Sequence, residues 1–201
     1  MKRIGVLLSG RGSNFVSIAD AITHGWLPGA KVAVVLSNVA GAPGVDAARE
    51  RGLPAHVIES KGRTRADHDV EMAARLHQHQ VELVCLAGYM RLLSPEFVRA
   101  FPDRILNIHP SLLPAFPGLD AHAQALEYGV KHSGCTVHFV DEALDHGVIV
   151  LQRVVPVLDT DDEQTLAARI LAQEHIAYPE AIARVLSGTH EIQGRRYVKR
   201  G

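Results

Sequence analysis

The sequence lacks the features that mark several protein classes. Only two of its 201 residues are cysteine, so no disulfide framework is expected and a reducing compartment is the default. The formal net charge is −1, and a near-neutral chain lacks the electrostatic signature of a general nucleic-acid binder. No apolar run approaches the ~18 residues that span a bilayer, and the run after Lys2 and Arg3 is too short for a signal peptide. We therefore expect a soluble cytoplasmic protein with no membrane or nucleic-acid partner.

Metal-binding patterns are missing too, although the chain contains 12 histidines. His77 and His79 stand two apart in a segment expected to be helical, so their side chains diverge. His132 and His138 flank the start of an expected strand, and His122 is isolated. No HExxH motif and no Cys/His zinc spacing occurs. The sequence predicts no structural or catalytic metal.

The length and composition are those of one globular domain over residues 1–201. Hydrophobic residues make up 47% of the chain and charged residues 21%, close to the globular average. A chain of this length buries enough surface for one well-filled core.

Strand-like and helix-like segments alternate along the first half of the chain. Apolar runs predict strands at 3–8, 31–36, 55–58, 81–86 and 104–108. Helical spacing predicts helices over 15–24, 45–51, 64–76 (with a capping box at Thr64 and Asp67) and 95–100. This alternation indicates a parallel sheet with helices on both faces, in which ligands bind at the carboxyl ends of the strands.

The pattern changes after residue 108. Pro110, Pro114 and Pro117 predict a structured loop over 109–118, followed by a helix over 121–128. Strand-like runs at 136–140 and 148–157 predict an antiparallel pair. A capping box over 160–163 precedes a long helix that Pro179 is placed to kink or split, and a short strand and loose tail are expected after 189. The predicted fold class is α/β, a Rossmann-like open, mostly parallel sheet with helices on both faces and a late antiparallel element.

The turn after the first expected strand has the composition of a phosphate-binding loop. It reads Ser-Gly-Arg-Gly-Ser-Asn over 9–14. Glycines allow close approach of the backbone, and the start of the next helix supplies free N–H groups. The third glycine and the acidic residue of a dinucleotide-binding fingerprint are missing, because Phe15 and Val16 follow and Ser37 and Asn38 end the second strand. A monophosphate therefore fits better than a nicotinamide dinucleotide, and an ordinary tight turn is the alternative.

A second group of polar residues follows the strand at 104–108. Asn107 and His109 stand two apart, so in extended chain both point to one face. An amide and an imidazole at a strand end suit carbonyl polarisation and proton transfer. Asp145 lies in the connection between the two later strands, where functional residues are frequent. The alternative is that Asn107 and His109 satisfy backbone groups and that Asp145 is an exposed loop residue.

The sequence around these residues resembles the folate-dependent formyltransferases. The resemblance rests on Asn-Ile-His-Pro-Ser-Leu-Leu-Pro over 107–114 and Phe-Pro-Gly over 116–118. It extends in order through residues 7–14, 86–95, 136–140 and 173–175. The Gly-Ser-Asn loop and the chain length are similar to those of members that formylate glycinamide ribonucleotide in purine biosynthesis. That resemblance implies a phosphate-binding half over about 1–100, a folate-binding and catalytic half over about 101–187, and a short tail over 188–201.

The resemblance implies formyl transfer from 10-formyltetrahydrofolate, a co-substrate, to the amine of glycinamide ribonucleotide, without a metal. Asn107 would donate a hydrogen bond to the negatively charged oxygen that forms when the amine attacks the formyl carbon. A protonated His109 would stabilise the same oxygen. Asp145 would accept or relay the proton that the amine loses, with Thr136 nearby, and contact with His109 would favour the charged imidazole.

The resemblance also assigns binding residues. The ribonucleotide phosphate would lie on Gly12, Ser13 and Asn14, and Glu174 would accept hydrogen bonds from the ribose hydroxyls. The pterin would meet backbone groups around the segments 90–93 and 140–145. The folate-binding residues expected are Arg65, Met90, Arg91, Leu92, Leu93, Asn107, Val140 and Asp141. Arg65 and Arg91 are the candidates for the anionic folate tail, and solvated surface charges are the alternative for both.

One position departs from the family pattern. The family commonly has Asp-Gly-Gly where this chain has Asp145, His146 and Gly147. A positive φ at 146 would strain a histidine, although His tolerates that region better than most residues. The departure at His146 therefore bears on the geometry of the folate-binding loop.

Three alternative functions remain to be separated. Methionyl-tRNA formyltransferases share the Asn-x-His signature but carry a further C-terminal domain, and formyltetrahydrofolate deformylases carry an extra N-terminal domain. The length of 201 residues favours the enzymes with a small ribonucleotide acceptor. A non-catalytic phosphate-binding module would not require Asn107, His109 and Asp145 together. The sequence is compatible with a monomer or a homodimer.

Overall fold

A computed structural model describes residues 1–201, which form two compact units, Met1–Asn107 and Ile108–Gly201. None of the helices is both long and apolar enough to cross a membrane.

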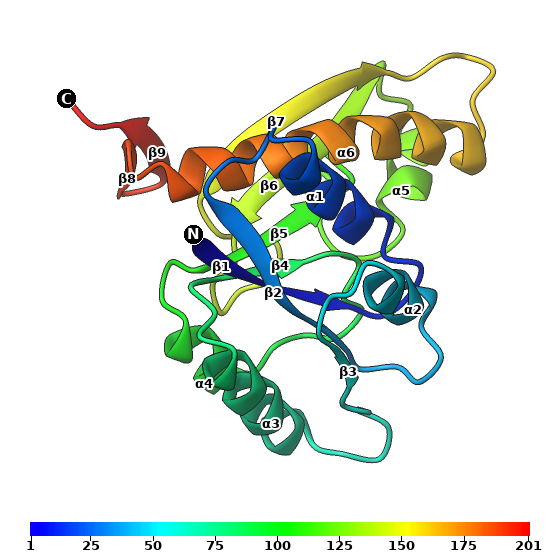
Figure 1. Ribbon diagram of the computed structural model, residues 1–201. Helices are drawn as coiled ribbons and strands as arrows, with labels where there is room; N and C mark the ends of the chain where they lie inside the picture. The colour runs from blue at the N-terminus through cyan, green and yellow to red at the C-terminus, as the bar shows by residue number, and fades with distance from the viewer. The chain divides into compact units, whose positions relative to one another are not determined.

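The first unit is a parallel β-sheet with helices on both faces. Its strands, in the spatial order β3-β2-β1-β4-β5, are β3 (Ala55–Val57), β2 (Ala30–Ser37), β1 (Lys2–Leu8), β4 (Leu83–Leu86) and β5 (Ile105–His109), whose last two residues belong to the second unit. Its helices are α1 (Ser13–Thr23), α2 (Pro43–Glu50), α3 (Arg65–Gln78) and α4 (Pro95–Ala100). In Figure 1, α1 and α2 lie on one face of the sheet, and α3 and α4 lie on the other.

The central strand shows why this arrangement forms. Val6, Leu7 and Leu8 are consecutive in β1, so their side chains point to alternating faces, yet all three are fully buried. A strand that is apolar on both faces must be covered on both faces, which is the signature of a parallel sheet between helix layers. The first unit thus confirms the parallel sheet and the helices on both faces predicted from the sequence.

The order of the strands fixes where a ligand site can form in this unit. The chain winds outward from β1 to β2 and β3, then returns and winds the other way from β1 to β4 and β5. The reversal lies between β1 and β4, so the loops that leave their carboxyl ends stand side by side. These loops are 9–12 and 87–94, and they flank the position where open α/β sheets bind ligands.

Close packing of backbone holds the loop at 9–12 in place. The amide of Gly44, at the start of α2, donates to the carbonyl of Gly10 at 3.0 Å. A Cβ on Gly44 would lie 2.7 Å from Leu8 Cδ2 and 3.1 Å from the Gly10 oxygen. A Cβ on Gly12 would lie 3.0 Å from the Gly44 Cα. Only glycine at 44 lets α2 approach the loop this closely.

The second unit is built from antiparallel strands and two helices. Its strands are β6 (His132–Phe139), β7 (Ile149–Pro156), β8 (His190–Gln193) and β9 (Arg196–Lys199), and its helices are α5 (Ala121–Tyr128) and α6 (Glu163–Leu186). β6 pairs antiparallel with β7, β7 pairs parallel with β9, and β9 pairs antiparallel with β8. Helix α6 packs against β6 and β7. The β6–β7 pair confirms the late antiparallel element.

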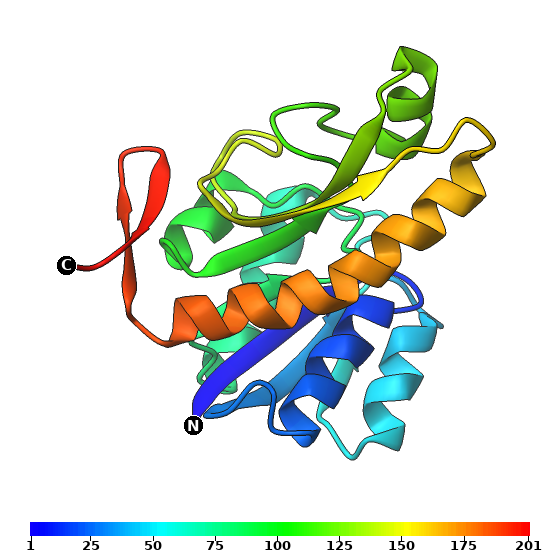
Figure 2. The same cartoon turned by 90° about the horizontal axis from the view of Figure 1, so that it is seen from above.

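Pro179 does not split α6, and the predicted position of the capping box is wrong. The helix runs without interruption through Pro179, as Figure 2 shows, because buried side chains such as Tyr178 and Ile182 hold its face against the strands. Its capping box pairs Asp162 with Thr165 rather than residue 160 with 163. The carboxylate of Asp162 accepts from the Thr165 amide at 2.8 Å, and the Thr165 hydroxyl accepts from the Asp162 amide at 3.0 Å.

Two further expectations need correction. The residues after 189 form the β8–β9 hairpin, not one strand and a loose tail. Contacts between Phe139 and Tyr197, whose ring centroids are 5.4 Å apart, help to fix the hairpin. Strand β6 starts at His132, four residues before the predicted start at 136, because Gly134 lies within pairing distance of β7, where a Cβ would be 1.9 Å from the Arg153 oxygen.

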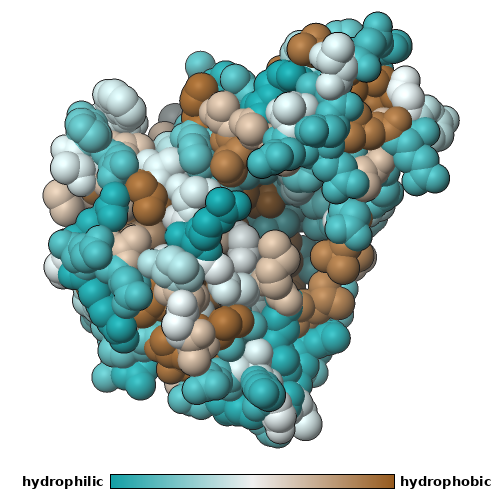
Figure 3. Space-filling model, turned by 90° about the vertical axis from the view of Figure 1, so that its right-hand side faces the viewer, coloured by the Kyte–Doolittle hydropathy of each residue, from teal (hydrophilic) through white to brown (hydrophobic).

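Exposed apolar residues are dispersed over the surface. On the face shown in Figure 3, hydrophobic residues stand singly or in small groups among hydrophilic ones. The large apolar side chains that are most exposed are Met1, Trp26, Val70, Met90, Leu119 and Tyr128. Single exposed apolar residues are normal on soluble domains and by themselves do not indicate a partner.

The contact between Gly44 and the 9–12 loop gives a stability prediction. Gly44→Ala forces a Cβ against Leu8 and should lower the free energy of unfolding by about 1–3 kcal/mol. Gly10→Ala is the matched control, because a Cβ there meets nothing within 4 Å, and it should change stability by less than about 0.5 kcal/mol. Urea denaturation of the three proteins measures the difference, and equal losses in both variants would contradict the packing argument.

Candidate active site

The predicted phosphate-binding residues lie at the start of α1. Gly12 is the N-cap and has φ 72°, a left-handed conformation that favours glycine. No side chain caps the helix, so the first-turn N–H groups and the positive end of the helix dipole are available to an anion. Ser13 is half-buried and Asn14 is 7% exposed. The turn is therefore of the kind that accepts a phosphate.

Ser9 joins this loop to the neighbouring strand ends. Its hydroxyl donates to Asn38 Oδ1 at 2.5 Å and accepts from the Met90 amide at 2.8 Å. Asn38 in turn donates from Nδ2 to Ser60 Oγ at 3.1 Å. Asn38 stands where a dinucleotide-binding protein has its acidic residue. In this chain it forms hydrogen bonds that connect the loop at Ser9 with the loop at Ser60. From the sequence, Asn38 was noted only because it stands where an acidic residue was expected. Its hydrogen-bond partners Ser9 and Ser60 are 29 and 22 residues away, so the sequence did not indicate this role.

The predicted folate residues at 90–93 lie in the loop after β4. Met90 is 75% exposed and Leu92 is 53% exposed, so this loop offers apolar side chains on the surface of the first unit. Arg91 donates to the carbonyls of Ser60 at 3.4 Å and Arg63 at 3.1 Å. These bonds tie the loop after β4 to the loop before α3, so Arg91 is not simply a solvated charge.

Leu93 belongs to this loop, whereas Arg65 lies in α3. Arg65 is the first residue of α3 and is exposed, whereas Leu93 is half-buried. Nearby, the buried carboxylate of Asp69 accepts from the Ser94 amide at 2.6 Å and lies 3.4 Å from His68 Nδ1. This internal contact fixes the end of the 87–94 loop.

His109, at the end of β5, is held in one orientation. It is 5% exposed, and its Nε2 lies 2.8 Å from the carbonyl oxygen of Phe116. A carbonyl oxygen only accepts, so Nε2 carries the proton in this contact. Nδ1 lies 3.4 Å from Asp145 Oδ2. Both ring nitrogens thus face oxygen acceptors. Asn107 precedes it by two positions in the same strand and is half-buried.

Asp145 is positioned by its backbone and by the 109–118 loop. Its φ is 47°, a left-handed conformation that is unusual outside glycine. Oδ2 accepts from the Gly118 amide at 2.8 Å, and Oδ1 lies 3.8 Å from His138 Nε2. The side chain is 9% exposed. The carboxylate is therefore largely shielded from water and has an imidazole on each side.

His138 is a component of the site that the sequence reasoning did not assign. It is 2% exposed and its Nδ1 donates to the Phe139 carbonyl at 2.8 Å. Burial lowers the pKa of His138 below its usual value, more than the nearby Asp145 carboxylate raises it. The neutral ring therefore presents the unprotonated Nε2 toward Asp145. The only sequence signal was a polar residue within an otherwise apolar strand.

Thr136 supports the 109–118 loop. Its hydroxyl donates to the Ser111 carbonyl at 2.7 Å and accepts from the Leu113 amide at 3.0 Å. Gln152 adds bonds to the Leu113 carbonyl at 2.9 Å and to Thr136 Oγ1 at 3.0 Å. These bonds occupy the Thr136 hydroxyl, so it holds the loop that carries His109, and the expectation that it stands beside the proton relay gains no support.

The 141–147 connection is fixed at both ends. The strain considered for His146 is absent, because the positive φ falls on Asp145 and not on His146. The next residue must be glycine, since a Cβ on Gly147 would lie 1.8 Å from the Phe139 oxygen. Asp141 Oδ1 accepts from the Ala143 amide at 2.9 Å, which closes a turn at the start of the connection.

His146 links this connection to the C-terminal hairpin. Its Nδ1 lies 2.8 Å from Asp141 Oδ2, and its carbonyl accepts from Arg195 Nη2 at 2.5 Å. Arg195 Nη1 also lies 3.3 Å from His146 Nε2. A ring protonated on Nδ1 alone satisfies all of these contacts, because it donates to Asp141 and accepts from Arg195. The side chain that departs from the family pattern thus has a definite structural partner on each side.

Glu174 is the predicted ribose-binding residue on α6. It is 7% exposed, and its carboxylate lies close enough to Cys135 to act on it electrostatically. Burial, first, and the Glu174 charge, second, raise the pKa of Cys135 to about 12. Cys135 is therefore a protonated, buried thiol. Val140, the remaining predicted folate residue, is half-buried at the end of β6.

The structure brings the predicted residues together in two groups. In the first unit, the 12–14 and 90–93 segments leave neighbouring strands at the reversal of strand order. In the second unit, His109 and Asp145 are in direct contact, and Asp141 lies in the same connection as Asp145. The chain contains no group of three or more His, Cys, Asp or Glu side chains arranged to hold a metal ion.

Comparison with known families and proteins gives consistent matches. The formyl transferase family matches residues 2–182. Phosphoribosylglycinamide formyltransferase of Escherichia coli (strain K12) is 45% identical over 181 residues, which cover 90% of this chain and 85% of the relative. The trifunctional purine biosynthetic protein adenosine-3 of Drosophila pseudoobscura pseudoobscura is 49% identical over 191 residues, but this chain spans only 14% of that protein's length.

Solved structures agree with the sequence matches. Glycinamide ribonucleotide transformylase 1 from Symbiobacterium toebii is 51% identical with a TM-score of 0.97, covering 100% of this chain and 95% of the other. A formyltetrahydrofolate deformylase from Pseudomonas syringae is 26% identical with a TM-score of 0.90, covering 100% of this chain and 67% of the other. The same fold thus occurs in a protein named as a glycinamide ribonucleotide transformylase and in one named as a formyltetrahydrofolate deformylase.

The close approach at Gly147 gives a prediction for the 141–147 connection. Gly147→Ala should lower the free energy of unfolding by about 3 kcal/mol, because the Cβ meets a backbone oxygen that cannot move without breaking β6. The adjacent His146→Ala leaves the backbone unchanged and should lower it by no more than about 1 kcal/mol. Chemical denaturation and amide hydrogen exchange over 141–147 measure both effects, and a stable Gly147→Ala protein with a protected loop would refute the argument.

Burial of His138 gives a pH prediction. The folded pKa of His138 is below the unfolded value of 6.5, so the unfolded chain binds more protons in mild acid. The stability due to the neutral ring is therefore full above about pH 6.5 and is lost as the pH falls through the folded pKa. His138→Asn keeps a donor for the Phe139 carbonyl without titrating, so its unfolding free energy should fall less between about pH 7 and pH 5. The exposed His132→Asn is the control, and a wild-type-like slope in His138→Asn would contradict the prediction.

Proposed function

The chain belongs to the formyl transferase family, and we propose that it transfers a formyl group from 10-formyltetrahydrofolate to the amine of glycinamide ribonucleotide in purine biosynthesis. The observation that carries the proposal is the contact between His109 and Asp145, at 3.4 Å, in a shielded position. The relatives that match along most of their own length support this acceptor, since they are named phosphoribosylglycinamide formyltransferases.

His109 and Asn107 would act on the formyl oxygen. When an amine adds to the formyl carbon, that oxygen becomes negatively charged. Preorganised hydrogen-bond donors stabilise this charge strongly. The Asn107 amide supplies one donor. His109 supplies a second when it exchanges its bond to the Phe116 carbonyl for one to the substrate, while its Nδ1 keeps the contact with Asp145.

Asp145 would accept the proton that the attacking amine loses. The attacking nitrogen gains positive charge and must lose a proton, and the departing nitrogen of the folate must gain one. A carboxylate with a bond from the Gly118 amide and an imidazole on either side is fixed in direction and shielded from bulk water. The neutral His138 adds no positive charge to this position.

The remaining residues would bind the two substrates. Gly12, Ser13 and Asn14 would hold the phosphate through the start of α1, and Glu174 would accept from the ribose hydroxyls. Asn107, Val140 and Asp141, with Met90 and the residues Arg91, Leu92 and Leu93, would contact the folate, and exposed Arg65 would meet its anionic tail. The exposed apolar side chains at 90 and 92 suit a flat aromatic ring system.

Hydrolysis of formyltetrahydrofolate is the second candidate function, because a deformylase from Pseudomonas syringae has the same fold with a TM-score of 0.90. The two functions differ only in the acceptor, which is an amine in one and water in the other. The proposal predicts formate release far slower than formyl transfer.

An acceptor assay tests the proposed function. The chain is supplied with 10-formyltetrahydrofolate and, in separate reactions, with glycinamide ribonucleotide, methionyl-tRNA or no acceptor. Product is expected only with the ribonucleotide, and formylated tRNA or rapid formate release would overturn the assignment.

The role of Asp145 can be tested with a substitution that keeps the backbone. Asparagine tolerates the left-handed conformation at 145 and can still accept from the Gly118 amide, so Asp145→Asn should fold normally. Its kcat should fall roughly 10²- to 10⁴-fold, because the carboxylate that accepts the proton is gone. Asp159→Asn, on an exposed carboxylate paired with Lys131, is the control. Near-normal turnover in a folded Asp145→Asn protein would remove Asp145 from the mechanism.

A further inference from the structure

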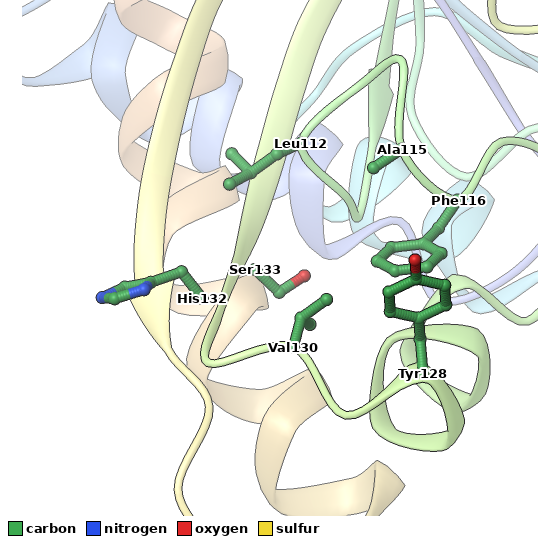
Figure 4. Close-up of a pocket in the computed structure, with 7 residues that line it drawn as sticks. All are labelled: Leu112, Ala115, Phe116, Tyr128, Val130, His132 and Ser133. Atoms are coloured by element: carbon green, nitrogen blue, oxygen red, sulfur yellow. The ribbon is translucent and has the colours of Figure 1, made fainter.

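A cavity in the second unit lies beside the 109–118 loop. It has a volume of about 370 Å³, within the range of small-molecule sites. Its lining, shown in Figure 4, comes from the loop, from the end of α5 and from the start of β6: Leu112, Ala115, Phe116, Tyr128, Val130, His132 and Ser133. None of these side chains has a role in the proposed reaction.

Ser133 places an unsatisfied polar atom in this mostly apolar cavity. The residue is 2% exposed, and its hydroxyl has no hydrogen-bond partner within the protein. Figure 4 shows the hydroxyl directed into the space between Val130 and the loop. Buried polar groups almost always have partners, and a hydroxyl both donates and accepts. The cavity thus has one fixed point for a ligand's hydrogen-bonding atom.

The opposite side of the cavity is aromatic. Phe116 and Tyr128 meet edge to face, with ring centroids 5.8 Å apart and an interplanar angle of 62°. Tyr128 is 80% exposed, so this aromatic wall is accessible from solvent. Two rings at a large angle offer both a face and an edge to a third ring, which is the geometry in which aromatic groups pack best.

Phe116 connects the cavity wall to His109. The Phe116 side chain lines the cavity, and the Phe116 carbonyl accepts the hydrogen bond from His109 Nε2 at 2.8 Å. Ala115, also in the wall, has its carbonyl bonded to the Ser111 hydroxyl at 2.6 Å. A ligand that moves the Phe116 ring therefore acts directly on the partner of the imidazole.

We propose that this cavity is a second small-molecule site, which binds a planar aromatic or heteroaromatic group through one hydrogen bond to Ser133, and that its occupant changes the setting of His109 through Phe116. The binding step is independent of the proposed function. The consequence for catalysis rests on that function, so the test uses signals that do not depend on formyl transfer.

Indole and indene are suitable probes, because they share shape and differ in one N–H donor. Each is titrated into the full chain and followed by backbone amide resonances and by the Cε1 resonance of His109, which is assigned with His109→Asn. We expect shifts around the cavity, indole binding about three- to tenfold tighter than indene, and movement of the His109 resonance.

Three variants separate the proposal from non-specific binding. Ser133→Ala removes only the hydroxyl and should make indole and indene bind equally. Val130→Trp fills the cavity and should weaken both probes more than about tenfold. Val154→Trp, the same change at an exposed position of β7 outside the cavity, should leave both affinities unchanged.

The experiments test the binding site and its connection to His109 separately. Equal binding of both probes to the wild type, or undiminished binding to folded Val130→Trp, overturns the site. Binding that leaves the His109 resonance fixed overturns the connection to His109. Neither failure bears on the acceptor assay, so the proposed function stands or falls separately.

Discussion

The carboxylate of Asp145 joins the 141–147 connection to the loop that carries His109. Its Oδ2 accepts from the Gly118 amide at 2.8 Å and faces His109 Nδ1 at 3.4 Å. A charged oxygen in a shielded position requires such partners, since an isolated buried charge is strongly unfavourable. The same oxygen therefore locates the end of the 109–118 loop and orients the imidazole. The left-handed backbone at 145, with φ 47°, is the local strain that this arrangement maintains.

Close backbone approach is the second constraint on the molecule. Gly147 lies against the Phe139 carbonyl, Gly134 against the Arg153 carbonyl, and Gly44 against the loop that holds Gly10 and Gly12. In each case a single methyl group would meet backbone or tightly packed atoms. The candidate site therefore depends on a few positions without side chains as much as on its titratable groups, and the hydrogen bonds of Thr136 and Gln152 complete the support of the His109 loop.

Much of the fold was predictable because its signals are local. The apolar run at 3–8 is buried on both faces of β1, and the Thr64 cap accepts from the Asp67 amide at 3.1 Å as expected. The predictions failed where tertiary contacts override local preference. Pro179 stays within α6, whose buried face packs against β6 and β7, and the residues after 189 pair as a hairpin through contacts with β7 and Phe139.

The sequence by itself determined the alternation of strands and helices, the Gly-Ser-Asn turn, and the pairing of Asn107 with His109 on one strand, because each depends on residues a few positions apart. Only the tertiary structure decided that Asp145 meets His109, that a neutral His138 stands on the other side of Asp145, and that His146 bridges Asp141 and Arg195. The contact of Asp145 with His109 and that of His146 with Arg195 join residues far apart in the sequence, the second pair 49 positions apart. Their pKa values and orientations depend on burial and on the folded backbone, which no local pattern of residues encodes.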